Sequence, residues 1–173
     1  MAGPFVDTDL DAELNLVELN CASTVHLAKR VVQDMVARGE GRILFTSSIA
    51  SQAPQPFQAA YGASKSFVQS LALALREELS DRGVSVTALL PGPTDTEFFD
   101  RADLTDTKLG ATDAKDDAAQ VARQGYEGLM NGDAAVFAGS LASKAMGRLS
   151  AVTPGPLATK LHRQMSEPGS ADS

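Results

Sequence analysis

The sequence predicts an α/β fold in which a doubly wound parallel sheet carries helices on both faces. Two observations lead to this prediction. Segments whose apolar residues recur every three or four positions alternate with short apolar runs, and these are the patterns of amphipathic helices and of buried strands. Elements that alternate in this way build a parallel sheet from βαβ units. With 173 residues, 43% of them hydrophobic, the chain is long enough for one domain with a sizeable core.

The first expected element is a long amphipathic helix over residues 11–38. Thr8 and Asp11 can cap its start. Its apolar positions are Leu10, Leu14, Val17, Cys21, Val25, Ala28, Val32 and Met35. A buried strand is expected next, from Arg42 to Ser47, because apolar residues follow one another there without a break.

A second helix is expected from Tyr61 to Leu79. It ends at the turn 81–83, because glycine commonly follows the last residue of a helix. The next buried strand is predicted from Val84 to Leu90, and Pro91 stops it.

The second half of the chain begins with a polar, aspartate-rich stretch that reaches from Thr96 to about Asp117. A third helix is expected at 115–130 and a short strand at 135–138. The pattern of residues 140–165 predicts two short helices, separated by the Pro-Gly-Pro segment 154–156. Residues 166–173 are polar enough to form a disordered tail.

Ser48, Tyr61 and Lys65 form the candidate catalytic set. A spacing of four residues on a helix places Tyr61 and Lys65 on one face. The ammonium is therefore expected to lower the pKa of the phenol, which is ordinarily about 10, toward the range of general acid-base catalysis. Ser48 follows a predicted strand, and open α/β sheets bind ligands at the carboxyl ends of strands. Its hydroxyl is expected to bind the substrate oxygen together with Tyr61.

A tyrosine and a lysine four residues apart also occur on many solvated helix faces, so the pair alone is a weak signal. Three further features favour catalysis. The pair opens a helical pattern, residues 62–64 between its members are small, and a strand that ends in two serines comes shortly before it.

With these motifs the chain resembles the short-chain dehydrogenase/reductase (SDR) family, single-domain Rossmann oxidoreductases that use NAD or NADP. The family commonly has a serine in the position of Ser48 and an asparagine in the preceding helix, which Asn20 matches. Its Pro-Gly motif with a threonine four residues after the glycine is matched by Pro91, Gly92 and Thr96.

The resemblance implies a role for each catalytic residue. Tyr61 would be the general acid or base, and Ser48 would orient the reacting oxygen. Lys65 would lower the pKa of Tyr61 and hold the nicotinamide ribose. Asn20 would hold a water that links Lys65 to solvent, although an ordinary polar residue inside a helix is an alternative reading.

The resemblance also implies where the cofactor and substrate lie. Pro91 and Gly92 would pass beside the nicotinamide, and Thr94 and Thr96 would bind its carboxamide or the phosphates, although the same segment is also typical of a turn that ends a strand. Phe98 and Phe99 would form an apolar wall of the substrate pocket, in a mobile flap. An acidic surface loop with both rings in the core explains these two residues equally well.

The N-terminal part of the family pattern is missing. No glycine-rich turn follows a strand, since Gly39 and Gly41 precede one, and such a turn would admit the cofactor pyrophosphate. The resemblance thus implies a partial Rossmann-like doubly wound parallel sheet that lacks its N-terminal strands, with residues 1–165 as the C-terminal part of a single domain. The strand at 42–47 would expose an edge, which predicts poor solubility for the chain expressed alone.

Two functions remain open. The first is an NAD(P)-dependent oxidoreductase that interconverts a small-molecule alcohol and a carbonyl by hydride transfer, of which this chain is a fragment. The second is a catalytically inactive remnant that acts as an association module. The resemblance implies a homodimer or homotetramer through the helices at 11–38 and 61–79.

Composition argues against several other classes. The net charge of −7 opposes nucleic-acid binding. No apolar run approaches the length that crosses a membrane, so a cytoplasmic protein is expected. Cys21, the single cysteine, cannot form an internal disulfide, and the two histidines, His26 and His162, lie far apart, so no metal site is expected.

Overall fold

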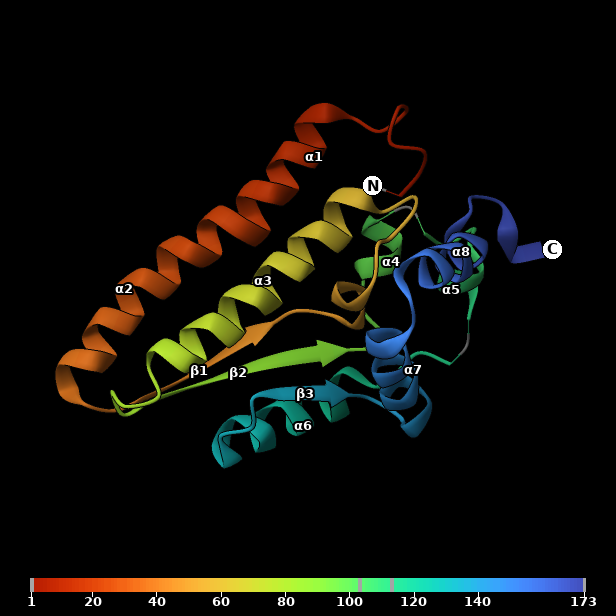
Figure 1. Ribbon diagram of the computed structural model, residues 1–173. Coiled ribbons are helices and arrows are strands. Elements are labelled where there is room, and N and C mark those ends of the chain that lie inside the picture. The colour runs from red at the N-terminus through yellow and green to blue at the C-terminus, as the bar shows by residue number, and fades with distance from the viewer. Residues whose placement is uncertain (1, 103, 113, 173) are drawn as a thin grey trace.

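A three-stranded parallel sheet forms the centre of the fold. The computed structural model describes residues 2–102, 104–112 and 114–172. Its strands β1 (Gly41–Thr46), β2 (Val84–Pro91) and β3 (Ala135–Ala138) lie in the order β1-β2-β3 (Figure 1). Both pairings are parallel, with Gly41 opposite Val84 and Ala88 opposite Ala135. The predicted α/β fold with a parallel sheet is therefore confirmed, and each predicted strand lies within one residue of its expected bounds.

The first helix differs from the prediction because it is not continuous. It consists of α1 (Leu10–Val17), a π-helical segment (Glu18–Ala22) and α2 (Ser23–Arg38). A π segment widens one turn of a helix, and such segments are frequent at functional sites. The cap also differs from the prediction, because the Asp9 side chain accepts a hydrogen bond from the Ala12 amide at 2.9 Å.

Helices cover both faces of the sheet. Figure 1 shows α2 and α3 (Ala59–Glu78) on one face and α6 (Ala118–Asn131) on the other. Central strand β2 alternates between them: Val86, Ala88 and Leu90 pack with α3, and Leu89 packs with α6. Gly125 lets α6 approach closely, because a Cβ there would meet the Leu89 side chain at 2.9 Å.

Helix α6 begins three residues after the predicted start. Asp117 is its cap and accepts hydrogen bonds from the amides of Ala119 at 3.1 Å and Gln120 at 3.3 Å. Asp116, the residue before the cap, pairs with Thr94 in a parallel β-bridge. That extended pairing prevents residues 115–116 from joining the helix.

The remaining helices gather at the carboxyl ends of the strands (Figure 1). They are α4 (Phe98–Arg101), α5 (Lys108–Ala111), α7 (Leu141–Val152) and α8 (Gly155–Ser166), and the last two were predicted. Asp103 and Asp113 of the predicted polar stretch lie outside the described residues.

The C-terminal segment differs from the expected disordered tail. Ser166 belongs to α8 and is fully buried. A short 3-10 helix (Ser170–Asp172) follows, and the amides of Gly169 and Ala171 donate to Asp106. These polar residues are ordered by specific hydrogen bonds, which composition does not reveal. Ser173 lies outside the described residues.

Strand β1 has one edge without a neighbouring strand among the described residues. A second cavity of about 360 Å³ runs along it and is lined by Leu27, Val31, Ile43 and Phe45 among others. This is the exposed edge that the sequence predicts. In the described part of the chain, no helix has the length and apolar character needed to cross a membrane.

Candidate active site

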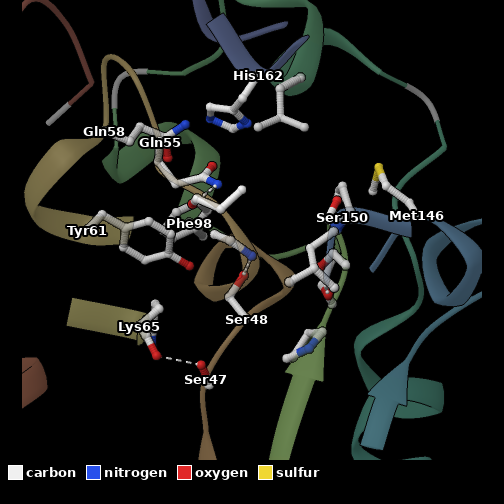
Figure 2. A pocket seen from close by; sticks show the side chains of 18 of the residues that line it. Ser47, Ser48, Gln55, Gln58, Tyr61, Lys65, Phe98, Met146, Ser150 and His162 are labelled. Carbon is white, nitrogen blue, oxygen red and sulfur yellow. Dashed lines mark hydrogen bonds between the residues drawn. The ribbon is translucent and has the colours of Figure 1, made fainter. Parts of the chain in front are cut away.

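One cavity of about 560 Å³ brings most of the predicted site residues together. It opens beyond the carboxyl ends of β1 and β2, between the start of α3 and helices α7 and α8 (Figure 2). Its lining includes the predicted residues Ser48, Tyr61, Lys65, Pro91, Gly92, Thr94, Thr96, Phe98 and Phe99. Of the predicted set, Asn20 alone does not line this cavity.

The local backbone holds Ser48 just after the carboxyl end of β1. Ser48 caps the short 3-10 helix Ile49–Gln52, and its Oγ accepts a hydrogen bond from the Ala50 amide at 3.1 Å. The Ser48 side chain also bonds to that of Tyr61. Ser48 and Tyr61 therefore face the same part of the cavity, as Figure 2 shows.

Tyr61 and Lys65 lie one turn apart near the start of α3. The Nζ of Lys65 lies 5.8 Å from the centroid of the Tyr61 ring and donates to the Thr46 carbonyl at 3.3 Å. Gly62 lets the loop after Ser48 pack on this turn, because a Cβ there would overlap the Gln55 side chain. The Oγ of Ser47 donates to the Lys65 carbonyl at 2.7 Å, which ties α3 to the end of β1 (Figure 2).

The pKa of Tyr61 moves in the opposite direction to the prediction. Burial of the phenol raises its pKa above the ordinary value, and the hydrogen bond with Ser48 opposes this only in part. Burial also lowers the pKa of Lys65, with the neighbouring Cys21 acting the other way. The prediction failed because burial disfavours the charged phenolate more than the nearby ammonium favours it. The ammonium lies over the face of the ring and donates to the Thr46 carbonyl, not to the phenol oxygen.

Asn20 reaches the site from the π-helical segment. Its Nδ2 donates to the Oγ of Ser64 at 2.9 Å, and Ser64 donates to the Tyr61 carbonyl at 2.7 Å. Asn20 and Lys65 both line the cavity along β1, and Lys65 lines the large cavity as well. Lys65 therefore connects the two cavities.

The segment after β2 forms the floor of the cavity. The Oγ1 of Thr94 donates to the Gly92 carbonyl at 2.9 Å, and the Oγ1 of Thr96 accepts from the Phe98 amide at 3.3 Å. Asp116 fixes this segment from behind: its amide donates to the Pro93 carbonyl at 2.8 Å, and its buried carboxylate accepts from the Ser140 amide at 2.7 Å.

The two phenylalanines line the cavity in different ways. The Phe98 ring packs against Tyr61, with a centroid distance of 5.1 Å. Phe99 is 4% exposed, and the Lys115 ammonium lies 4.6 Å from its ring centroid. Phe98 therefore lies in the cavity wall beside Tyr61, whereas Phe99 is a buried residue that also reaches the cavity.

Several residues that line the cavity were not predicted from the sequence. They come from the loop before α3 and from helices α7 and α8, and include Gln55, Gln58, Met146, Ser150 and His162 (Figure 2). The position of Gln55 and Gln58 between Ser48 and Tyr61 could have indicated them. Nothing in the sequence indicates the other three, because only tertiary packing brings α7 and α8 over the cavity.

His162 is a cavity residue whose pKa is shifted far from its ordinary value. Burial lowers its pKa to about 4, so the imidazole is neutral at pH 7. Within the described ranges, no group of three His, Cys, Asp or Glu side chains is placed to hold a metal ion.

Comparison with known proteins gives the family. Residues 1–107 match the sequence model of the short chain dehydrogenase family. The chain therefore belongs to that family, as its motifs predicted.

Individual relatives agree with this assignment. The chain is 32% identical over 130 residues to the dehydrogenase/reductase SDR family member 7B of Mus musculus, an alignment that covers 72% of this chain and 40% of the relative. It is 41% identical over 83 residues to the very-long-chain 3-oxoacyl-CoA reductase of Neurospora crassa, covering 48% and 25%. The chain thus spans well under half the length of these relatives.

Among solved structures, a short-chain dehydrogenase from Sphingobium yanoikuyae in complex with NADPH is similar. The TM-score is 0.72 at 28% identity, and the match covers 79% of this chain and 52% of that one. The Rossmann-like arrangement is therefore shared with an enzyme of the same family.

Proposed function

We propose that the protein is an NAD(P)-dependent oxidoreductase that interconverts an alcohol and a ketone or aldehyde. The observation that carries the proposal is that Ser48, Tyr61 and Lys65 line one cavity at the carboxyl ends of β1 and β2. A hydroxyl, a phenol and an ammonium that share a cavity can hold a carbonyl oxygen and move a proton to or from it.

The residues present fit the nicotinamide end of a dinucleotide. An ammonium has three N–H donors, and Thr46 is the one hydrogen-bond acceptor of Lys65 within the described residues, so two donors remain for ribose hydroxyls. Gly92, Thr94 and Thr96 border the same space. When bound, the nicotinamide would supply or accept the hydride. The NADPH in the similar Sphingobium enzyme supports this choice of cofactor.

The proton steps follow from the geometry. In carbonyl reduction, the Ser48 hydroxyl would bond to the substrate oxygen, and Tyr61 would donate its proton to that oxygen. Lys65, with its charge near the ring, would stabilise the phenolate that remains. Asn20 and Lys65 line the same cavity, and water in that cavity would replace the proton that Tyr61 gives up.

The test compares two tyrosine variants of the protein. Each variant and the parent are assayed for carbonyl reduction with NADPH and with NADH. The chain has two tyrosines, and Tyr126 is 62% exposed. Tyr61→Phe removes the proton donor and is expected to lower kcat/KM by at least about 100-fold. Tyr126→Phe should retain activity. A Tyr61→Phe variant that folds and turns over like the parent would refute the proposal.

A second property is supported by surface composition. We propose that the protein also self-associates through the helical segments 11–38 and 61–79. Exposed apolar side chains on these segments are Leu14, Val17, Leu19, Val25, Leu27, Val31, Phe67 and Leu73. Several large apolar side chains exposed on neighbouring helices favour an interaction site on these segments. It would persist in a catalytically inactive protein, so loss of activity with intact association would favour the association module.

A further inference from the structure

The cavity has an end that the proposed chemistry does not use. His162 of α8 and Gln55 of the loop before α3 line it, and Figure 2 shows both at the opposite side of the view from Lys65. They belong to one hydrogen-bonded group: the Gln58 amide nitrogen bonds to the Gln55 carbonyl at 3.1 Å, and the Gln58 side chain bonds to Ser166 at 3.4 Å. Ser166 in turn bonds to His162 at 2.9 Å.

The protonation of His162 follows from these bonds. Ser166 is fully buried, so its O–H needs an acceptor. The side-chain nitrogen of Gln58 only donates, so the hydroxyl donates to the Nε2 of His162. A neutral imidazole that accepts at Nε2 carries its proton on Nδ1.

Two polar atoms at this end therefore remain without a partner among the described residues. The Nδ1–H of His162 has no acceptor, since its ring is bonded through Nε2 alone. The Oε1 of Gln55 has no donor, although its Nε2 donates to the Ala53 carbonyl at 2.8 Å. Gln55 as a whole is 8% exposed, and it lines the cavity.

The rest of the cavity is mostly apolar and carries little charge. Lys65 is the one Lys, Arg, Asp or Glu side chain among the described residues that line it. Apolar lining near His162 comes from Met146, Leu149, Leu161 and Met165. A carboxylate or phosphate bound at the His162 end would be buried without a cation, which is costly.

We propose that His162 and Gln55 form a subsite that binds a second, uncharged polar group of the substrate, a hydroxyl, remote from the reacting oxygen. A hydroxyl fits because it accepts from Nδ1–H and donates to Oε1 at once. The substrate class is thus a bulky apolar alcohol or ketone that carries a distal hydroxyl, and His162 is a specificity-determining residue. This inference rests on the proposed function, since it assigns the second end of the same cavity.

The test compares three ligands by thermal shift and calorimetry, which need no turnover: 2-decalone, 6-hydroxy-2-decalone and the corresponding 6-carboxylate. Each neutral hydrogen bond that is lost raises Kd by about 3- to 10-fold. We expect the hydroxy ketone to bind at least about 3-fold more tightly than decalone, and the carboxylate to bind more weakly than either.

His162→Phe keeps a ring and removes both nitrogens, so it should abolish the preference for the hydroxy ketone. His26→Phe is the matched control, because His26 is exposed on α2, and it should keep the preference. Should His162→Phe fail to fold, Gln55→Met removes Oε1 and is expected to reduce the same preference. Equal binding of decalone and hydroxy-decalone, or a preference that survives both cavity variants, would overturn the inference.

The two proposals fail in distinguishable ways. A preference for the hydroxy ketone without reduction by NADPH or NADH would refute the oxidoreductase and retain the subsite. Reduction of both ketones with equal kcat/KM would retain the oxidoreductase and refute the subsite.

Discussion

The side chain of Asn20 donates a hydrogen bond to Ser64 at 2.9 Å, across 44 positions of the sequence. Ser64 is 3% exposed and lies on the turn of α3 between Tyr61 and Lys65. The π-helical segment Glu18–Ala22 that carries Asn20 is therefore fixed directly to the helical turn that carries the candidate acid-base pair.

The two residues that this hydrogen bond joins, Asn20 and Ser64, should be energetically coupled. Asn20→Ala and Ser64→Ala are each expected to lower the free energy of unfolding by about 0.5–1.5 kcal/mol, because each leaves a partly buried polar group without its partner. Urea unfolding of both single variants and the double variant should give a coupling of about 1 kcal/mol. Asn15→Ala, at an exposed position of α1, is the control and should change stability by less than about 0.5 kcal/mol. Strictly additive losses would show that the two residues do not stabilise one another.

Acidification should destabilise the protein through His162. Its folded pKa of about 4 lies below the ordinary histidine pKa of 6.5, so the folded state binds fewer protons than the unfolded state. Its contribution is fully present above pH 6.5 and is lost as the pH falls toward 4. Allowing for partial exposure, wild type should lose about 1–2 kcal/mol more than His162→Phe between pH 8 and pH 5. Denaturant unfolding at both pH values measures this, and identical pH dependences would contradict it.

Two glycines with the same backbone conformation should respond differently to alanine. Gly83 and Gly132 have φ of 72° and 75°, and a left-handed residue with a Cβ costs about 1–2 kcal/mol. A Cβ at Gly83 would also overlap the Gly39 carbonyl, whereas nothing lies within 4 Å at Gly132. Gly83→Ala should therefore destabilise by about 1–3 kcal/mol more than Gly132→Ala, measured by urea unfolding. Equal losses would mean that the turn at Gly83 relaxes freely.

Charges on the exposed apolar helices should weaken self-association. Leu14 and Leu27 are 56% and 62% exposed, and replacing both with lysine would bury two charges in any interface that covers them. Light scattering after size-exclusion chromatography should show the double variant shifted toward the monomer mass of 18.1 kDa. Leu141→Lys, at an 85% exposed position on α7, should leave the mass unchanged. A parent chain that is already a monodisperse monomer would contradict both this prediction and the expected poor solubility.

Local pattern accounts for much of the fold and for three of the candidate site residues that line the cavity. Apolar alternation placed β1, β2 and β3 because burial of their side chains dominates their choice of structure. Tyr61 and Lys65 could be found because a four-residue spacing places them on one face of a helix. Ser48 could be found because it follows the end of a strand.

Other features depended on contacts between distant segments. The π-helical segment at Asn20 and the ordered C-terminal segment are held by partners 44 and 63 positions away. The start of α6 is set by the bridge between Thr94 and Asp116. The direction of the Tyr61 pKa was predicted wrongly, because a four-residue spacing gives the neighbouring charge but not the burial that outweighs it.

By itself, the sequence determined the α/β class, the strands and the positions of the candidate residues Ser48, Tyr61 and Lys65, since periodicity and short-range spacing depend on local geometry. Only the tertiary structure decided the shape and chemistry of the cavity. Gln55, Met146 and His162 come from three separate segments, and the charge state of His162 depends on its burial, which no local pattern records.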